Sequence, residues 1–426
     1  MPEDIFFNIM AGLSAEDVDR LNDRFYGRFN YPWAPMLLPT YHDPGFWAQA
    51  LNMDLGYYDP PVFGAGMHIW VAGCGTNQAV LTALKFPQAR VIGSDLSAES
   101  LRVCARIAEQ IGLTNLTLRQ ESLNATTYAE TFDYVLCTGV IHHNADPAVP
   151  LASLSRALKH GGVLELMVYN YYHRVQTTAF QKAIRLLGGG NGLPNVDREL
   201  PLTRRLIDSF PAGFHMATLL ADQRGMPEAA VADVLLQPVE HSYTIASLSE
   251  LAGRCGLRLA TYCVNQFDKV SGHIEWEMGF EEAEVARAYA TLPDLDRWQV
   301  TNLLRGEASP RLWFYLQRAN SPRPCPPARD LTGAFLDTVF EPNVTTAQGY
   351  VLGDAQEYHL SPTRLPCPAP ARPGDRTAAA VFAEVDGKRS MQPILDRLGM
   401  TRHAERLRLQ LATSGYPYLR PVQQSG

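Results

Sequence analysis

HIWVAGCGTNQAV begins at His68, VIGSDLSAESL at Val91 and FDYVLCTGVIHHNADP at Phe132, and these three segments determine the architecture of the chain. Each segment starts with an apolar run and ends in glycine or polar residues. Helical stretches separate the runs at the spacing of βαβ units, which predicts a parallel sheet. Ligands of such sheets bind beyond the carboxyl ends of the strands. Because the glycine and polar residues fall at that edge, the sequence predicts a nucleotide-type pocket there.

Two glycines form the turn after the first of these strands. Gly73 and Gly75 follow the apolar run that ends at Ala72, and helical sequence resumes near Gln78. Glycine lets the backbone turn sharply and lets a ligand approach where a Cβ atom would collide. A tight strand-to-helix turn that serves packing alone would have the same spacing. The turn therefore indicates a ligand site only together with other residues.

Asp95 is one such residue, because it ends the second strand about twenty residues after the glycines. A carboxylate at this position can accept hydrogen bonds from both hydroxyls of a ribose. Its other role is to cap the helix expected from Ser97 to Ile111, for which Ser97 is itself a good N-cap. The two roles can coexist.

The end of the third strand, in LTLRQESLNA from Leu116, falls where an adenine ring could lie. Ser122 could then meet the exocyclic amine and Leu123 could cover the ring. A solvated loop is the other interpretation.

With these motifs the chain resembles the class I methyltransferases that depend on S-adenosylmethionine (SAM). The resemblance is specific over about residues 70 to 170, and it rests on the glycine turn, on Asp95 and on Gly139–His143 followed by Asp146-Pro147. It implies an α/β fold with a Rossmann-like, doubly wound sheet, and methyl transfer that converts SAM to S-adenosylhomocysteine. The cofactor contacts that it implies are Ala72, Gly73, Cys74, Gly75, Thr76, Asn77, Gln78, Asp95, Leu96, Ser97, Ser122, Leu123 and Thr138.

The chain departs from the family pattern at two positions. Val71 stands where an acidic residue usually precedes the first glycine, and Asn77 replaces the usual third glycine. A bare carboxylate is therefore missing from the methionine end of the pocket. We expect Asn77 and Gln78, beside a helix N-terminus, to hold the amino acid part of the cofactor instead.

Two alternatives share some of these features. An NAD(P)-dependent oxidoreductase would have the glycines and Asp95, but a dinucleotide fingerprint needs a third glycine where this chain has Gln78. No Tyr-x-x-x-Lys pair is placed for hydride chemistry either. A binding or scaffold protein that keeps the fold without the transfer activity is the second alternative, and Val71 is the residue that favours it.

Methyl transfer depends mainly on positioning, and a base is needed only when the acceptor arrives protonated. His142 and His143 end the strand that begins at Phe132, and alternation predicts that one of them faces the pocket. Hydrogen bonding to loop carbonyls is the alternative role for both. Tyr169 and Tyr172 end the next strand and could orient a planar or cationic acceptor, although core packing would also explain these rings.

The composition limits the partners and the location. The net charge of −7 argues against a nucleic-acid substrate, and we expect a small-molecule or short-peptide acceptor, in natural-product biosynthesis. No run of eighteen apolar residues is present, which predicts no membrane span. Seven scattered cysteines and an N-terminus without a basic region before its apolar stretch favour the cytoplasm, and no metal site is expected.

With 426 residues the chain should contain more than one domain. The C-terminal part combines short helices with strand segments in a winged-helix-like pattern, which predicts homodimerisation or partner docking, with structural support as the alternative. The aromatic-rich N-terminal part is either a lid over the pocket or a cap on the sheet. The expected division is an N-terminal helical cap or lid (1–60), a SAM-binding core (61–171), a helical insertion that forms the substrate wall (172–242), the rest of the core with a helical insert (243–320), a proline-rich linker (321–330) and a C-terminal module (331–426).

Overall fold

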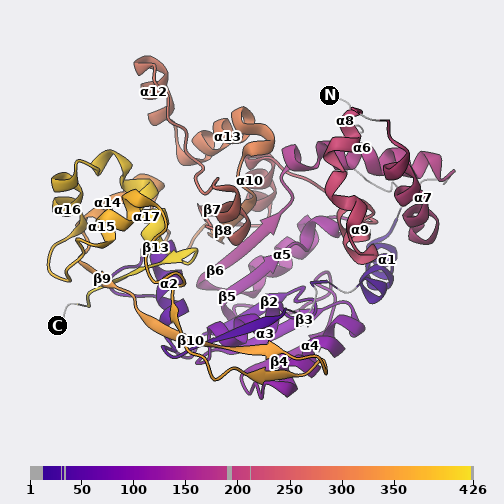
Figure 1. Ribbon diagram of the computed structural model, residues 1–426, viewed down its shortest axis with the longest axis horizontal. Coiled ribbons are helices and arrows are strands. Elements are labelled where there is room, and N and C mark those ends of the chain that lie inside the picture. Colours follow the sequence, from indigo (N-terminus) through magenta and orange to yellow (C-terminus); the bar gives the residue numbers. More distant parts are fainter. Residues whose placement is uncertain (1–12, 30, 33–34, 190–193, 212, 424–426) are drawn as a thin grey trace.

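The computed structural model describes residues 13–29, 31–32, 35–189, 194–211 and 213–423. In this part of the chain a seven-stranded sheet forms the centre of the molecule (Figure 1). All neighbouring strands in it are parallel except those that pair with β8, which runs antiparallel to both β6 and β7. The spatial order is β4 (Leu116–Gln120), β3 (Arg90–Asp95), β2 (His68–Ala72), β5 (Phe132–Thr138), β6 (Leu158–Val168), β8 (Leu312–Arg318) and β7 (Leu257–Tyr262). The predicted Rossmann-like α/β fold is confirmed.

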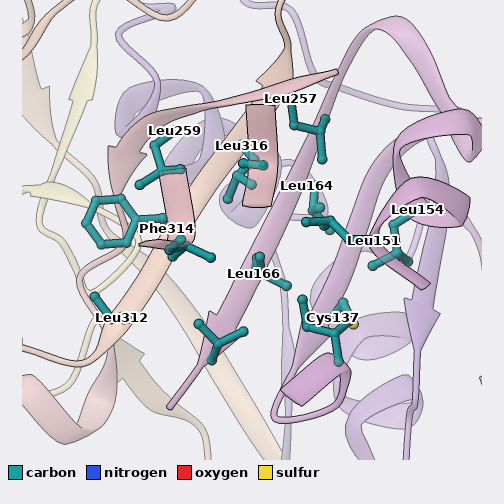
Figure 2. Close-up of a cluster of buried hydrophobic side chains, with 14 of the residues drawn as sticks. Cys137, Leu151, Leu154, Leu164, Leu166, Leu257, Leu259, Leu312, Phe314 and Leu316 are labelled. Carbon is teal, nitrogen blue, oxygen red and sulfur yellow. The ribbon is translucent and has the colours of Figure 1, made fainter. Parts of the chain in front are cut away.

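Helices cover both faces of this sheet because its strands are apolar on both sides, as expected for buried parallel strands. One core cluster joins the sheet to α5 (Ala148–Ala157), α10 (Ile245–Arg254) and α13 (Asp294–Arg305), and Figure 2 shows some of its leucines with Phe314 and Cys137. The cluster on the opposite face includes α2 (Phe46–Asp54), α3 (Gln78–Lys85) and α4 (Ala98–Gln110). Two further helices, α11 (Gln266–Ser271) and α12 (Ala283–Ala290), lie between β7 and α13 in the chain.

The N-terminal helix packs on the helical insertion. Helix α1 (Ala15–Arg28) begins at the N-cap Ser14, and its Phe25 and Phe29 share a buried cluster with Phe180 and Ile184. Figure 1 shows α1 beside α9 at the end of the molecule where the insertion lies. The insertion comprises α6 (Tyr171–Leu187), α7 (Val196–Ser209), α8 (His215–Leu219), the 3-10 turn η3 (Ala221–Gly225) and α9 (Glu228–Leu235).

The C-terminal part contacts both the N-terminal region and the core. Strand β1 (Leu37–Tyr41) pairs antiparallel with β10 (Thr345–Leu352), so segments about 300 residues apart share a second, four-stranded sheet. Ala50 and Met53 of α2 lie in the same buried cluster as the C-terminal helices. Within the proline-rich segment, Cys325 is buried and its backbone N–H donates to Gln317. The remaining C-terminal elements are α14 (Ala328–Asp337), β9 (Phe340–Pro342), β11 (Tyr358–Leu360), β12 (Leu365–Cys367), α15 (Arg376–Phe382), α16 (Met391–Leu398), α17 (Ala404–Leu411), β13 (Ala412–Thr413), β14 (Tyr416–Pro417) and β15 (Leu419–Pro421).

The N-terminal region contacts both the helical insertion and the C-terminal part of the chain. The helical insertion and the C-terminal helices lie at opposite ends of the sheet (Figure 1). The division of the chain into six parts, and the winged-helix-like character of the last, stay predictions.

Candidate active site

A cavity of about 380 Å³ lies at the carboxyl ends of β2, β3 and β5. The predicted glycine turn, Asp95 and the adenine-side loop all line it, as does Gly139 after β5. Its other walls come from α1, from Tyr31 and Pro32, from α9 and from the region of Phe267 and Trp313. The cavity thus occupies the edge of the sheet that the sequence predicts, in the size range of small-molecule sites.

The glycine turn requires glycine for steric reasons. Gly75 has φ +53°, and a Cβ atom there would lie 2.4 Å from the carbonyl oxygen of Tyr31. At Gly73, with φ +73°, a Cβ atom would collide with Val140 at 2.5 Å. The N-terminal segment therefore lies directly over the turn, and the backbone of Thr76 also donates to Tyr31.

The carboxylate of Asp95 joins the two turns that border the cavity. Its Oδ2 accepts the N–H of Gly75 at 2.8 Å and its Oδ1 accepts the N–H of Ser97 at 2.9 Å. Burial raises the pKa of this carboxyl, although these backbone N–H groups favour the charged form. Ser97 is the N-cap of α4 and accepts from Ser100, as the sequence predicts. Each carboxylate oxygen keeps a lone pair, so the capping role leaves Asp95 able to accept ribose hydroxyls.

The adenine-side loop is held by α1. Ser122 donates from Oγ to Asp19 at 2.6 Å, and Asn124 donates to the other oxygen of Asp19 at 3.1 Å. Leu123 is 7% exposed and lines the cavity. Contacts within the protein therefore hold the loop at the end of β4. The apolar side chain of Leu123 lines a cavity that also has polar residues in its wall.

Asn77 and Gln78 begin helix α3 at the cavity wall. Asn77 is the N-cap residue, and Gln78 donates from Nε2 to Thr138 Oγ1 at 2.6 Å. Their amide groups lie near the positive end of the helix, which suits a carboxylate ligand. Val71, which replaces the usual acid, is fully buried in β2.

The two histidines take different positions, because Ile141–His143 form a 3-10 turn, η2, after β5. His143 lines the cavity, and its Nδ1 lies 2.7 Å from the carbonyl oxygen of Val239, which makes Nδ1 the donor and leaves Nε2 as an acceptor. Burial lowers the pKa of His143 to about 4. His142 is fully buried against Tyr169, outside the cavity lining, and neither ring nitrogen has a partner among the described residues.

Some of the other predicted site residues line the cavity, and the rest are buried or lie outside it. Tyr169 lines the cavity, whereas Tyr172 packs edge-on against Tyr171 outside it. Ala72 and Thr76 are buried behind the turn, and the Thr76 hydroxyl donates to the carbonyl of Pro32. The remaining predicted residues that line the cavity are Gly73, Cys74, Gly75, Asn77, Gln78, Asp95, Leu96, Ser97, Ser122, Leu123 and Thr138. The functional role of each stays a prediction.

Sequence reasoning missed several residues of the lining. Met167 comes from β6, close in the sequence to the predicted Tyr169. The others come from α1, from the helical insertion and from late core elements, all distant in the sequence from the motifs: Asp19, Asn22, Asp23, Asp233, Gln266, Phe267 and Trp313. The aromatic density of the N-terminal region was a signal for Tyr26 and Tyr31. No local motif marks Asp233.

A family model described as a methyltransferase domain matches residues 64–185. This segment contains the glycine turn, Asp95 and the cavity edges of β2, β3 and β5. The chain contains a class I SAM-dependent methyltransferase domain. Its cofactor is SAM, and the glycine turn and the buried carboxylate of Asp95, which line one cavity, fit an adenosyl ligand.

The chain is also similar to individual proteins, one of which is a methyltransferase by name. The chain is 26% identical over 337 residues to an uncharacterised protein of Synechococcus, covering 75% of each chain. It is 34% identical over 122 residues to a trans-aconitate 2-methyltransferase of Azoarcus, covering 27% of this chain and 46% of that one. The match therefore spans less than half of this second relative.

A solved structure shares the fold over most of the chain. PKMT2 from Rickettsia typhi in complex with AdoHcy has a TM-score of 0.56 at 14% identity, covering 92% of this chain and 78% of that one.

In the part of the methyltransferase chain that the structure describes, no helix is long and apolar enough to cross a membrane. The same residues contain no cluster of His, Cys, Asp and Glu able to hold a metal ion.

Substitution of Asp95 by alanine should weaken SAM binding about tenfold or more, on the order of 1.4 kcal/mol, because two hydroxyl acceptors are lost. Calorimetric titration of SAM measures the effect. Asp95→Asn is the matched variant, since it keeps the shape and one acceptor oxygen, and an intermediate loss is expected for it. Unchanged SAM affinity in Asp95→Ala would refute the ribose assignment.

Proposed function

We propose that the protein transfers the methyl group of SAM to a small-molecule or short-peptide acceptor, in natural-product biosynthesis. One observation carries the proposal: Asp95 and the glycine turn line a single cavity that continues to an aromatic wall containing Tyr26, Tyr31 and Tyr169. Its volume of about 380 Å³ suits small ligands, and the net charge of −7 disfavours nucleic acid.

The bound cofactor supplies an electrophilic methyl group on a sulfonium, so the protein mainly has to position the acceptor. The glycine turn, Asp95 and the Asn77–Gln78 pair would hold the cofactor. Tyr169 would orient the acceptor, and Tyr172 would act through its packing on Tyr171. His143 offers Nε2 as a hydrogen-bond acceptor. Its pKa of about 4 makes it a weak base near neutral pH, where an effective base titrates close to pH 7.

The enclosure of the site supports a lid role for the N-terminal region. Asn22 of α1 donates to the carbonyl of His143 at 2.8 Å, and Asp19 binds the adenine-side loop. Helix α9 of the insertion supplies the substrate wall through Asp233. For the C-terminal part we propose homodimerisation or partner docking, as the sequence predicts.

Two measurements test the proposed function. Calorimetry should detect binding of SAM and tighter binding of S-adenosylhomocysteine, whereas a scaffold protein that has lost the activity would bind neither. Incubation with methyl-labelled SAM and a small-molecule extract of the source cells should then label a low-molecular-weight product. Cofactor binding without any labelled product would contradict the proposed acceptor class.

The Asn77→Ala, Gln78→Ala double variant should bind SAM about tenfold more weakly, because the amino acid part of the cofactor loses two amide partners. Calorimetry measures the affinity for SAM. Gln88→Ala is the control, because it removes an exposed glutamine at the opposite edge of the sheet and should leave this affinity unchanged. Equal SAM affinity in the double variant and in the wild type would refute this assignment.

A further inference from the structure

The helical insertion contributes one carboxylate to the cavity. Asp233 of α9 lines it, and its Oδ1 accepts the Nε2–H of Gln237 at 2.9 Å. The same Nε2 donates to the hydroxyl oxygen of Tyr26 at 3.1 Å, which connects α9 to α1. The second carboxylate oxygen, Oδ2, has no hydrogen-bond partner among the described residues, so it can accept from a ligand.

Three tyrosines, Tyr26, Tyr31 and Tyr169, line the same cavity as this carboxylate. Burial raises the pKa of Tyr26 and of Tyr31, and the charge of Asp233 raises both further. Gln237, which donates to both Asp233 and Tyr26, places the Tyr26 hydroxyl near the carboxylate. The faces of aromatic rings attract cations, and they do so most strongly where water is excluded.

The positive charge that acts on Asp233, that of Arg174, is already paired. Arg174 donates two hydrogen bonds of 2.6 Å to the buried Glu240 and a third to the carbonyl of Val234, and its guanidinium stacks on Tyr169 at 4.5 Å. None of the described residues that line the cavity is a lysine or an arginine, whereas five are acidic. An anionic acceptor would therefore be repelled, and a cationic one attracted.

We propose that Asp233 binds the acceptor as a protonated amine and takes a proton from it, so that nitrogen is the atom methylated. This inference rests on the proposed function and names its substrate class. After the proton moves to Asp233, the nitrogen lone pair forms the new bond to the methyl carbon, the carbon–sulfur bond breaks, and its electron pair stays on sulfur. The deprotonated amine is neutral, whereas a deprotonated phenol would place an anion beside the carboxylates.

The surroundings of Asp233 suit a proton acceptor. Burial raises the pKa of its carboxyl to about 6, with Glu240 adding to the rise and with Arg174 and Gln237 opposing it. The group is therefore mostly ionised at neutral pH, and its raised pKa makes it a stronger proton acceptor than an ordinary carboxylate.

Matched fragments test the preference for a cation. We expect n-butylammonium to bind the S-adenosylhomocysteine-saturated protein about tenfold or more tightly than n-butanol, because a charged hydrogen bond contributes more than a neutral one. Sodium butyrate should bind more weakly than either. NMR titration measures all three, and Asp233→Asn should remove the preference for the ammonium ion. Asp222→Asn is the control, because it removes an exposed carboxylate of the same insertion outside the cavity lining.

Three results of the fragment titration would overturn the proposal: equal binding of n-butylammonium and n-butanol, no binding of n-butylammonium, or an unchanged preference in Asp233→Asn. A loss of S-adenosylhomocysteine affinity in Asp233→Asn as large as the loss for n-butylammonium would assign the carboxylate to the ammonium group of the cofactor instead. In the labelled product of the extract experiment the new methyl group should be on nitrogen, and a methyl group on oxygen or carbon would contradict the assignment. Failure of the wild type to bind SAM is a separate result, which refutes the proposed function itself.

Discussion

Replacement of Gly75 by alanine should weaken SAM binding about a hundredfold, because strain at a backbone position of this kind and a direct collision together cost a few kcal/mol. The new Cβ atom would lie 2.4 Å from the carbonyl oxygen of Tyr31 and 2.9 Å from Pro32. The N-terminal segment would have to move off the turn, and the N–H of Gly75 would lose its alignment with Asp95. Calorimetric titration of SAM measures the loss.

Gly112 provides a control for backbone strain alone. Its φ of +69° resembles that of Gly75, but a Cβ atom there would meet nothing within 4 Å. Gly112→Ala should therefore lower the free energy of unfolding by about 1–3 kcal/mol and leave SAM affinity unchanged. If Gly75→Ala bound SAM as tightly as Gly112→Ala does, contact between the N-terminal segment and the turn would have no part in cofactor binding.

The central sheet could be predicted because its signals are local. Apolar runs mark β2, β3 and β5, and Ser97 marks the start of α4 as its N-cap. Parallel strands bring their carboxyl ends to one edge whatever the rest of the chain does. The glycine turn and Asp95 therefore lie together at the cavity, as expected from sequence alone.

The rest of the site depends on contacts between distant segments. Asp19 reaches Ser122 across 103 positions, and Asp233 reaches the cavity only because α9 packs against α6 and α1. The pairing of β1 with β10 joins positions about 300 residues apart. No local pattern encodes such pairings, since many alternative partners would satisfy the same apolar residues.

The histidine pair has a different geometry from the strand end that the sequence predicts. Alternation along a strand predicts that one of the two histidines faces the pocket, and His143 alone lines it. However, β5 ends at Thr138 and the pair lies in a 3-10 turn. Sequence could not predict the burial that lowers the pKa of both rings, because it depends on contacts such as those of His142 with Tyr169 and of His143 with Val239.

Replacement of Arg408 by methionine should lower the free energy of unfolding by about 2–3 kcal/mol, because the Glu405 carboxylate, whose side chain is only 23% exposed, loses two charged hydrogen bonds. Arg408 of α17 is 1% exposed and donates two hydrogen bonds, of 3.0 and 2.9 Å, to Glu405. Glu405 also accepts from Tyr262 of β7 and from Thr332 of α14, so the pair connects the C-terminal helices to the central sheet. Urea denaturation followed by circular dichroism measures the change.

The double variant Arg408→Met, Glu405→Met separates the unpaired charge from lost packing. It should be more stable than Arg408→Met alone, because replacing both partners of a buried ion pair removes the uncompensated carboxylate. Arg102→Ala breaks the exposed pair with Glu99 at the same spacing of three residues and should leave the unfolding midpoint unchanged. If Arg408→Met were as stable as Arg102→Ala, the C-terminal helices would be held to the sheet by apolar contacts alone.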